Sequence, residues 1–138
     1  MNDYRWEDLS LGMRVQFEVP LTEDMMTVFA AISGDLNPLH LDEAYARQNG
    51  FPGRVAFGML TSSLYSRLVG MYLPGKRALL QGIDVEFKRP AHIGDVLTVS
   101  GEVTYLNEAY RRVELKGQIV NPAGKLISTA KIRVGVHE

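Results

Sequence analysis

Residues 54–72 constrain the fold most, because they are apolar or small at nearly every position. A Phe-Pro-Gly turn at residues 51–53 precedes this stretch, and a Pro-Gly pair at residues 74–75 ends it. A helix that is apolar all round is stable only when other parts of the protein surround it. At about 1.5 Å per residue it spans roughly 28 Å, the width of a small domain. The sequence therefore predicts one long buried helix, with Met59 and Met71 in the core.

The second half of the chain alternates apolar and polar residues, as half-buried strands do. Four such strands follow the helix, and their apolar residues are Ile83, Val85 and Phe87, then Leu97, Val99, Val103 and Tyr105, then Val113, Leu115, Gly117 and Ile119, and last Ala130, Ile132, Val134 and Val136. Consecutive strands joined by turns predict an antiparallel meander with one face toward solvent. Another strand, residues 15–19, precedes the helix. Only the central helix can cover the other face, so we expect an α+β fold in one domain, residues 1–138, with the sheet curled around that helix.

Two shorter helices are predicted before the central one. Thr22 is a candidate N-cap for the first, because its hydroxyl can accept a hydrogen bond from a free main-chain N–H. The apolar face of that helix is expected at Met25, Phe29 and Ile32. Asp42 is the corresponding cap of the second helix.

Charge and composition exclude several functions. The net charge is -1, with 15 basic and 16 acidic residues and no run of one sign, so no broad attraction to nucleic acid or a membrane is expected. The chain has no cysteine, which excludes disulfides and thiol catalysis and fits a reducing compartment. The polar N-terminus is not a secretory signal, and no cluster has metal-ligand spacing. We therefore expect a cytoplasmic protein with no metal site.

The segment Ser-Gly-Asp-Leu-Asn-Pro-Leu-His, which ends at His40, carries the candidate chemistry. Asp35 and His40 lie on a stretch that we expect not to be regular helix, because Gly34, Asn37 and Pro38 are turn formers. The Asn37 side chain is expected to pin this loop. A carboxylate held beside an imidazole suits proton transfer, since histidine titrates near neutrality and the carboxylate can orient it or share a water with it.

Three segments, in this order, resemble the MaoC-like, (R)-specific enoyl-CoA hydratases. Residues 34–42 resemble the hydratase motif, residues 57–60 (Phe-Gly-Met-Leu) the start of the family's central helix, and residues 90–97 its sheet turn. The resemblance implies the hotdog fold, in which a sheet wraps around one helix. It also implies that Asp35 and His40 hold a catalytic water for reversible syn hydration of a trans-2-enoyl thioester to the (R)-3-hydroxyacyl thioester.

Phe57 departs from this resemblance, because the family commonly has histidine there. If that histidine orients the thioester, its absence changes the rate or the substrate preference. The departure leaves Asp35 and His40 in place. His40 is expected to act as the base while Asp35 holds the same water, and the sequence leaves open which of the two delivers the proton to C2.

The start of the central helix is the candidate oxyanion site, because the first turn of a helix has free N–H groups and a positive dipole end. Gly58 lies near that end and has no Cβ to keep a carbonyl oxygen away. Ser62 and Ser66 lie one and two turns further along the same stripe. Either serine is a candidate to line the acyl tunnel, with Ser66 favoured by the resemblance, although small-residue packing is the interpretation that the pattern itself favours for both.

Two other functions compete with hydration. A hotdog acyl-CoA thioesterase often uses an acidic residue on the central helix, and residues 51–75 contain none. A non-catalytic acyl-thioester binding module needs the pocket without the pair of Asp35 and His40. No separate cofactor is expected, since coenzyme A is part of the substrate, and an acyl carrier protein remains an alternative carrier.

The resemblance and the exposed edge of a single curled sheet imply a homodimer or a higher homo-oligomer. Candidate contacts for the coenzyme A phosphates are Arg47, Arg54, Lys76, Arg77, Lys88 and Arg89, and the sequence does not choose among them. Both remaining histidines, His92 and His137, are expected to be solvated.

Overall fold

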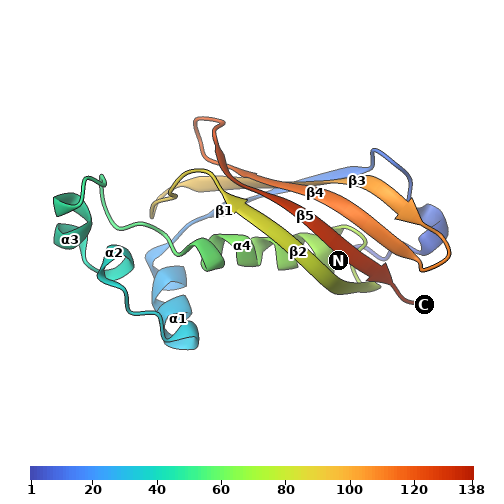
Figure 1. The fold of residues 1–138 in the computed structure, drawn as a ribbon, viewed down its shortest axis with the longest axis horizontal. Helices are drawn as coiled ribbons and strands as arrows, with labels where there is room; N and C mark the ends of the chain where they lie inside the picture. The colour runs from blue at the N-terminus through green and yellow to red at the C-terminus, as the bar shows by residue number, and fades with distance from the viewer.

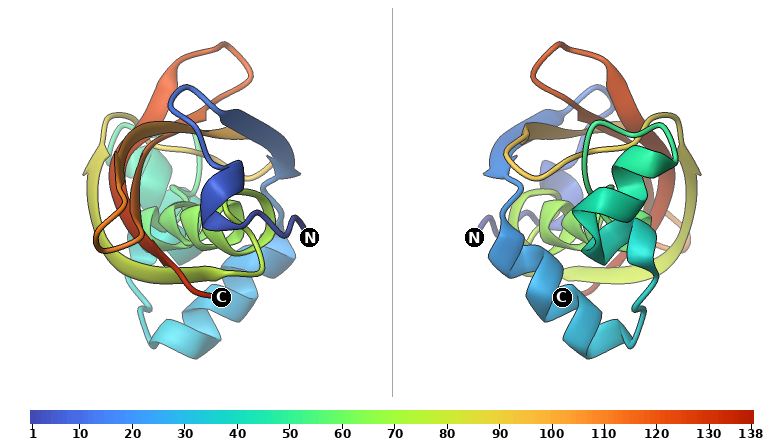
Figure 2. Two further views of the ribbon diagram at one scale, coloured as in Figure 1. Left: turned by 90° about the vertical axis from the view of Figure 1, so that its right-hand side faces the viewer. Right: turned by 90° about the vertical axis from the view of Figure 1, so that its left-hand side faces the viewer.

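The computed structural model describes residues 1–138, and its centre is a curled antiparallel sheet with a helix along the concave side (Figures 1 and 2). The sheet has five strands in the order β1-β3-β4-β5-β2. Their bounds are β1 Arg14–Pro20, β2 Ala78–Phe87, β3 Val96–Asn107, β4 Arg112–Val120 and β5 Leu126–Val136. The helices are α1 Glu23–Ser33, α2 Pro38–Leu41, α3 Glu43–Gln48 and α4 Gly58–Arg67, with a 3-10 turn η1 at Trp6–Asp8 and a π-type turn η2 at Leu68–Tyr72. The predicted α+β fold, with the sheet around one helix, is confirmed.

The prediction of a simple meander is wrong for one strand. Strands β3, β4 and β5 do follow one another as antiparallel neighbours. Strand β2, however, pairs with β5 and forms the edge opposite β1. The chain between β2 and β3 therefore crosses the concave side, where Ala91 accepts a hydrogen bond from the Ala56 N–H. That crossing brings residues 88–92 to the start of α4.

The central helix begins at Gly58, four residues later than the sequence predicts. Residues 54–57 are extended because their main-chain groups bond to other segments and not to one another. Val55 pairs with His92 as an isolated antiparallel bridge, and its N–H donates to the Leu39 carbonyl at 3.1 Å. At the other end, η2 continues α4 to Tyr72, where the predicted helix ends.

One face of α4 lies in the core and the other is uncovered. Tyr65 and Leu68 are buried against the sheet within a hydrophobic cluster of 24 residues. By contrast, Met59 is 67% and Met71 is 44% exposed, so the prediction that both lie in the core is wrong. The single chain therefore does not surround its central helix completely.

Both predicted N-caps are confirmed, whereas the predicted apolar face of α1 is only partly buried. Thr22 accepts a hydrogen bond from the Met25 N–H at the start of α1, and the Asp42 side chain caps α3. The buried residues of α1 are Met26 and Ala30, whereas Ile32 is 79% exposed. No helix in the structure has the length and apolar character needed to cross a membrane.

Candidate active site

The loop after α1 is held by its own side chains. Gly34 ends α1 in the left-handed conformation, at φ 72°, which glycine adopts without steric cost. The next carboxylate, Asp35, accepts the Asn37 N–H through Oδ1 at 3.1 Å. The Asn37 side chain in turn accepts the Leu39 N–H at 2.9 Å and caps α2, which is the pinning contact predicted for it. Asp35 Oδ2 is thereby left to face His40.

The expectation that no part of this stretch is regular helix is wrong for the short helix α2. Pro38 keeps Asn37 out of the helical region, as expected, with ψ at 127°. Proline is also well suited to the first position of a helix, because it lacks the N–H that would go unpaired there. The four residues Pro38–Leu41 therefore form one helical turn that carries His40.

His40 presents one ring nitrogen to the Asp35 carboxylate and bonds through the other. Its Nδ1 lies 2.8 Å from the Val55 carbonyl oxygen, which only accepts, so Nδ1 carries the proton and donates it. In the neutral imidazole Nε2 then has a lone pair, and it lies 3.9 Å from Asp35 Oδ2. That distance is too long for a direct hydrogen bond and lets one water oxygen lie about 2.8 Å from both atoms. The imidazole side chain is 16% exposed and the carboxylate 48%.

Phe57 packs against the imidazole. The centroids of the Phe57 and His40 rings are 4.2 Å apart. The ring centroid of Phe29 lies 4.9 Å from that of Phe57. Phe57 is 1% exposed. In this chain, position 57 therefore supplies an apolar wall that limits rotation of the His40 ring.

One cavity of about 310 Å³ contains both His40 and the start of α4. Its lining residues are His40, Val55, Ala56, Gly58, Thr61, Phe87, Lys88, Arg89, Pro90, Ala91 and Ile127. Phe57, the N-cap of α4, offers no side-chain hydrogen bond to the first turn. The Gly58 N–H has no acceptor within the fold and is free to bind an oxygen. A Cβ at Gly58 would lie 3.0 Å from the Phe87 ring, so glycine keeps this part of the cavity open.

The two serines are not part of this cavity. Ser62 is buried and donates its hydroxyl to the Met59 carbonyl, and Ser66 lies on the exposed face of α4. Thr61 lines the cavity instead, and its hydroxyl donates to the Gly58 carbonyl at 2.8 Å. Thr61 was not predicted, because it lies three residues from Gly58 and the stripe of small residues runs at intervals of four.

The structure separates the candidate basic residues. Lys88 and Arg89 line the cavity. Lys76 and Arg77 pair with Asp3 near the N-terminus, at distances of 4.0 and 2.6 Å.

Two other side chains are engaged within the fold. Arg47 pairs with Glu43 on α3 at 3.0 Å. His92 is half-buried, and its Nδ1 lies 3.0 Å from the Arg54 carbonyl oxygen, so the expectation that it is solvated is wrong. No group of three or more histidine, aspartate and glutamate side chains is arranged to hold a metal ion.

Comparison with known proteins identifies the family of this chain. A family model described as "MaoC like domain" matches residues 9–121. The chain is 36% identical over 125 residues to an (R)-specific enoyl-CoA hydratase of Aeromonas caviae, covering 91% of this chain and 93% of the relative. It is also 36% identical to a 3-hydroxybutyryl-CoA dehydratase of Methylorubrum extorquens, over 80% of this chain and 70% of that protein.

A solved structure, R-hydratase PhaJ1 of Pseudomonas aeruginosa, superposes with a TM-score of 0.93 at 33% identity. The match covers 99% of this chain and 87% of that one. The chain belongs to the MaoC-like domain family, with the hotdog fold.

Proposed function

We propose that this protein is an (R)-specific enoyl-thioester hydratase/dehydratase, which adds water reversibly and in syn geometry to a trans-2-enoyl-CoA. One observation carries the proposal: a single cavity joins His40, whose Nε2 lone pair faces Asp35, to the free N–H of Gly58. The names of the relatives described above support the same reaction and the same stereochemistry.

The reaction requires a base, an acid and a site for negative charge. A water bound between Asp35 and His40 adds its oxygen to C3 of the enoyl group. His40 Nε2 takes a proton from that water, and the electron pair of the double bond moves through C2 to the thioester oxygen. A proton from the same pair then reaches C2, which completes the hydroxyacyl product. Each well-placed acid or base contributes about 10²–10⁴-fold to the rate of such reactions.

The Gly58 N–H stabilises the enolate-like oxygen. It lies at the positive end of α4, where the first-turn N–H groups are unpaired. A single oxyanion donor of this kind contributes roughly 3–4 kcal/mol in enzymes where it has been removed. Thr61 supports this oxyanion site indirectly. Its hydroxyl donates to the Gly58 carbonyl and so fixes the orientation of the first turn of α4.

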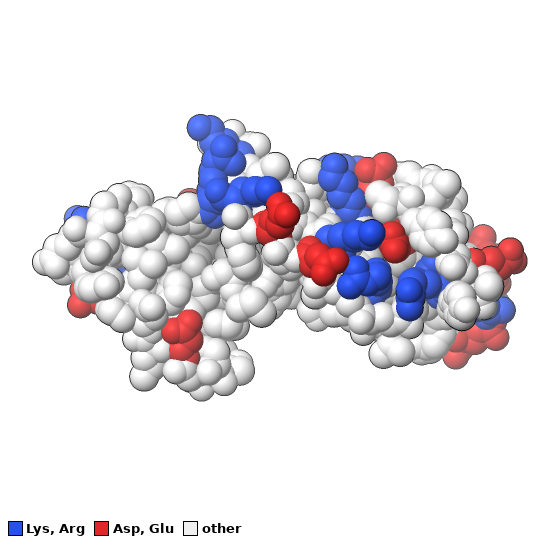
Figure 3. Space-filling model, in the orientation of Figure 1, with Lys and Arg blue, Asp and Glu red and all other residues white.

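Lys88 and Arg89 are the proposed contacts for the phosphates of coenzyme A. Both line the cavity that holds His40 and Gly58. Arg89 donates to the Leu126 carbonyl and Lys88 bonds to Glu86, so both are anchored at the sheet end of the cavity. Figure 3 shows basic side chains gathered over the β4–β5 hairpin and the adjoining end of β2. An acyl carrier protein, which presents a phosphopantetheine on an acidic surface, is the alternative carrier for the same contacts.

A homodimer is the proposed assembly. Strand β2 pairs only with β5, so its other edge is free. Leu79 on this strand is 61% exposed, and Phe87, which lines the cavity, is 52% exposed. A second copy paired along β2 would cover both. A cytoplasmic location and the absence of a separate cofactor stay predictions from the sequence.

The proposed function is tested by incubating the protein with crotonyl-CoA. Loss of the conjugated enoyl absorbance is expected, without release of free thiol and with the (R)-3-hydroxy product. His40→Ala and Asp35→Asn are each expected to lower kcat by about 10²–10⁴-fold, because each removes one partner of the bound water. The melting curve of Asp35→Asn should match the wild type within a few degrees, since this side chain is exposed. His40→Ala is expected to melt somewhat lower, because it loses the contact with Phe57 and the hydrogen bond to Val55.

The competing functions predict different outcomes of the same assay. Release of thiol would identify a thioesterase, although α4 carries no acidic residue. Binding of enoyl-CoA with no chemical change, at every chain length from short to long, would identify a binding module. Either outcome would contradict the proposed hydration.

A further inference from the structure

The extended residues 54–57 join the candidate base to the candidate oxyanion site. On one side, the Val55 N–H donates to the Leu39 carbonyl, and the Val55 carbonyl accepts the His40 Nδ1–H. On the other side, the Ala56 N–H donates to the Ala91 carbonyl at 2.8 Å. Helix α4 then begins immediately, at Gly58. A shift of this segment would therefore move the base and the oxyanion donor together.

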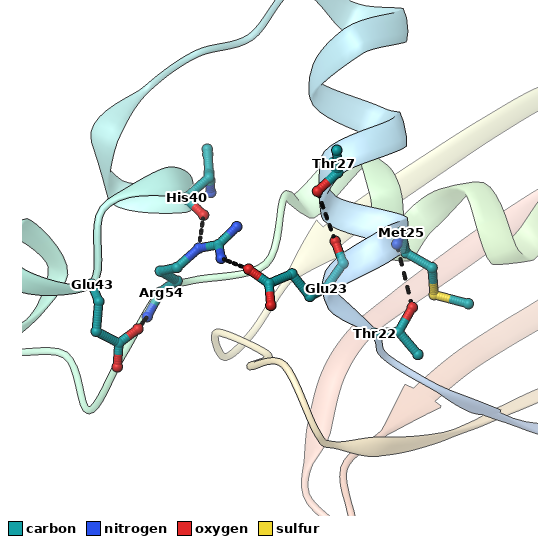
Figure 4. A network of polar contacts seen from close by, with 7 residues as sticks. All are labelled: Thr22, Glu23, Met25, Thr27, His40, Glu43 and Arg54. Atoms are coloured by element: carbon teal, nitrogen blue, oxygen red, sulfur yellow. Dashed lines mark hydrogen bonds and ion pairs between the residues drawn. The ribbon is translucent and has the colours of Figure 1, made fainter.

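The Arg54 side chain bonds to the same loop. Its Nε donates to the main-chain carbonyl of His40 at 2.8 Å, and its Nη1 donates to Glu23 Oε1 at 2.9 Å (Figure 4). The side chain of Arg54 is 14% exposed, against 71% for Glu23. Because the guanidinium is planar and its donors form a rigid fork, the two bonds fix the position of the His40 carbonyl relative to α1.

The main chain of Arg54 is held as well. Its N–H donates to Glu43 Oε2 at 3.2 Å, and its carbonyl accepts from His92 Nδ1 at 3.0 Å. The hydrogen bond from the Arg54 N–H is the main cause that holds the pKa of the Glu43 carboxyl below its usual value. The side chain and the main chain of Arg54 are thus both engaged within the fold.

We propose that Arg54 is a positioning residue for His40. The guanidinium fixes the His40 main chain while the carbonyl of the next residue, Val55, fixes the ring, so two adjacent residues set both the place and the tautomer of the base. An error of about 1 Å in the place of a catalytic group costs about 10²-fold in rate. The kinetic part of this inference rests on the proposed hydratase function.

The kinetic test compares Arg54→Gln and Arg54→Lys with Arg47→Gln. Arg47 is the matched control, because it is an exposed arginine that also bonds to Glu43 and touches no residue of the site. Both Arg54 variants are expected to lower kcat about 10- to 100-fold and to leave KM within about threefold, since the substrate contacts remain. Lysine keeps the charge but has no planar fork, so an unchanged kcat in Arg54→Lys would overturn the proposal. A rise in KM at constant kcat would also overturn it and would indicate substrate binding.

Chemical rescue separates positioning from a loss of folding. Arg54 lines a cavity of about 610 Å³ that small ions can enter. In Arg54→Ala, ethylguanidinium is expected to restore kcat at least tenfold, whereas ethylammonium at the same ionic strength is not. Equal effects of the two cations, or no rescue while the variant melts like the wild type, would overturn the proposal.

A third measurement does not depend on activity. Long-range ¹H–¹⁵N spectra report which imidazole nitrogen carries the proton, and His40→Gln assigns the His40 signal among the three histidines. The wild type is expected to show the Nδ1–H tautomer of His40, and Arg54→Gln a mixture of tautomers. Unchanged His40 shifts in Arg54→Gln would contradict the positioning role. This result stands even if the wild type hydrates no enoyl thioester, an outcome that would contradict only the proposed function.

Discussion

At the scale of single residues, position 57 has a different role from the one that the resemblance implies. A histidine at this position would be a second polar ring beside the base. Here the phenyl ring packs 4.2 Å from His40 and is 1% exposed, so the imidazole has an apolar neighbour on one face. Together with the Val55 carbonyl on Nδ1, this neighbour leaves Nε2 as the only ring atom available for proton transfer.

Replacing Phe57 by Leu is expected to lower kcat several-fold and to reduce the free energy of unfolding by about 1–2 kcal/mol, because a flat wall and buried area are lost. Phe29→Leu is the matched control. It removes a ring that contacts Phe57 while the contact between Phe57 and His40 remains. Steady-state kinetics and urea unfolding of both variants check this, and equal losses of kcat in the two would show that the wall has no role in catalysis.

At the scale of elements, the sequence predicts those features that depend only on residues close together in the chain. The caps Thr22 and Asp42 and the alternation of the strands are local patterns, and the structure has them, except that Phe87 and Tyr105 are exposed. The place of β2 and the extended residues 54–57 were not predictable in this way. Their partners are β5 and the segments at residues 39–40 and 91–92, which lie far along the chain.

The same distinction applies to the site. The short spacing of Asp35 and His40 in a turn predicts that they face each other, and they do. The Val55 carbonyl that fixes the tautomer comes from another segment and was not predictable. The sequence offers six basic candidates, and only the folded chain shows that Lys88 and Arg89 are the two that line the cavity with His40.

The contact between α4 and the sheet depends on a row of small residues. Gly101, Gly117 and Ala130 are direct neighbours on β3, β4 and β5. A Cβ at Gly117 would lie 2.7 Å from the Tyr65 ring, and one at Gly101 would lie 2.7 Å from Leu68. The row is therefore a shallow furrow in which side chains of the central helix lie.

Gly117→Ala is expected to reduce the free energy of unfolding by about 1–3 kcal/mol, since the added methyl group overpacks the furrow. Gly135→Ala on β5 is the control, because the only close contact of its Cβ is the amide end of the exposed Gln81 side chain, and the Leu79 carbonyl oxygen lies at an ordinary 3.8 Å. Urea unfolding measures both variants. A similar effect at the two glycines would mean that strand conformation, and not contact with Tyr65, decides the cost.

Tyr65 also predicts a pH dependence. Its hydroxyl bonds to Ser128 at 2.8 Å, and burial raises its pKa from 10.0 to about 12. The folded state therefore favours the neutral form of Tyr65. The free energy of unfolding is expected to be at its full value below about pH 10 and to fall by about 3 kcal/mol between about pH 10 and 12, where the unfolded chain ionises first. Denaturant unfolding across this range should show a steeper fall for the wild type than for Tyr65→Phe, which has no proton to lose. Parallel curves for the two proteins would contradict this.

At the scale of the whole molecule, two features are incomplete in the single chain. Strand β2 has an unpaired edge, and the cavity that holds His40 is lined by the half-exposed ring of Phe87, at the end of the same strand. An unpaired apolar edge favours association with another strand. A two-fold axis that pairs β2 with its copy would continue the sheet and cover Phe87 in both chains.

Light scattering after size exclusion is therefore expected to give twice the 15.4 kDa mass of one chain. Leu79→Glu places a charge on the exposed apolar edge that this pairing would bury, and should shift the mass to that of one chain. If the partner closes the cavity, the same variant loses activity in proportion to its monomer fraction, and raising the protein concentration restores both. Leu11→Glu is the control, since Leu11 is equally apolar, 66% exposed and located in the turn before β1. A wild type of single-chain mass with full activity would show that one chain completes the site alone.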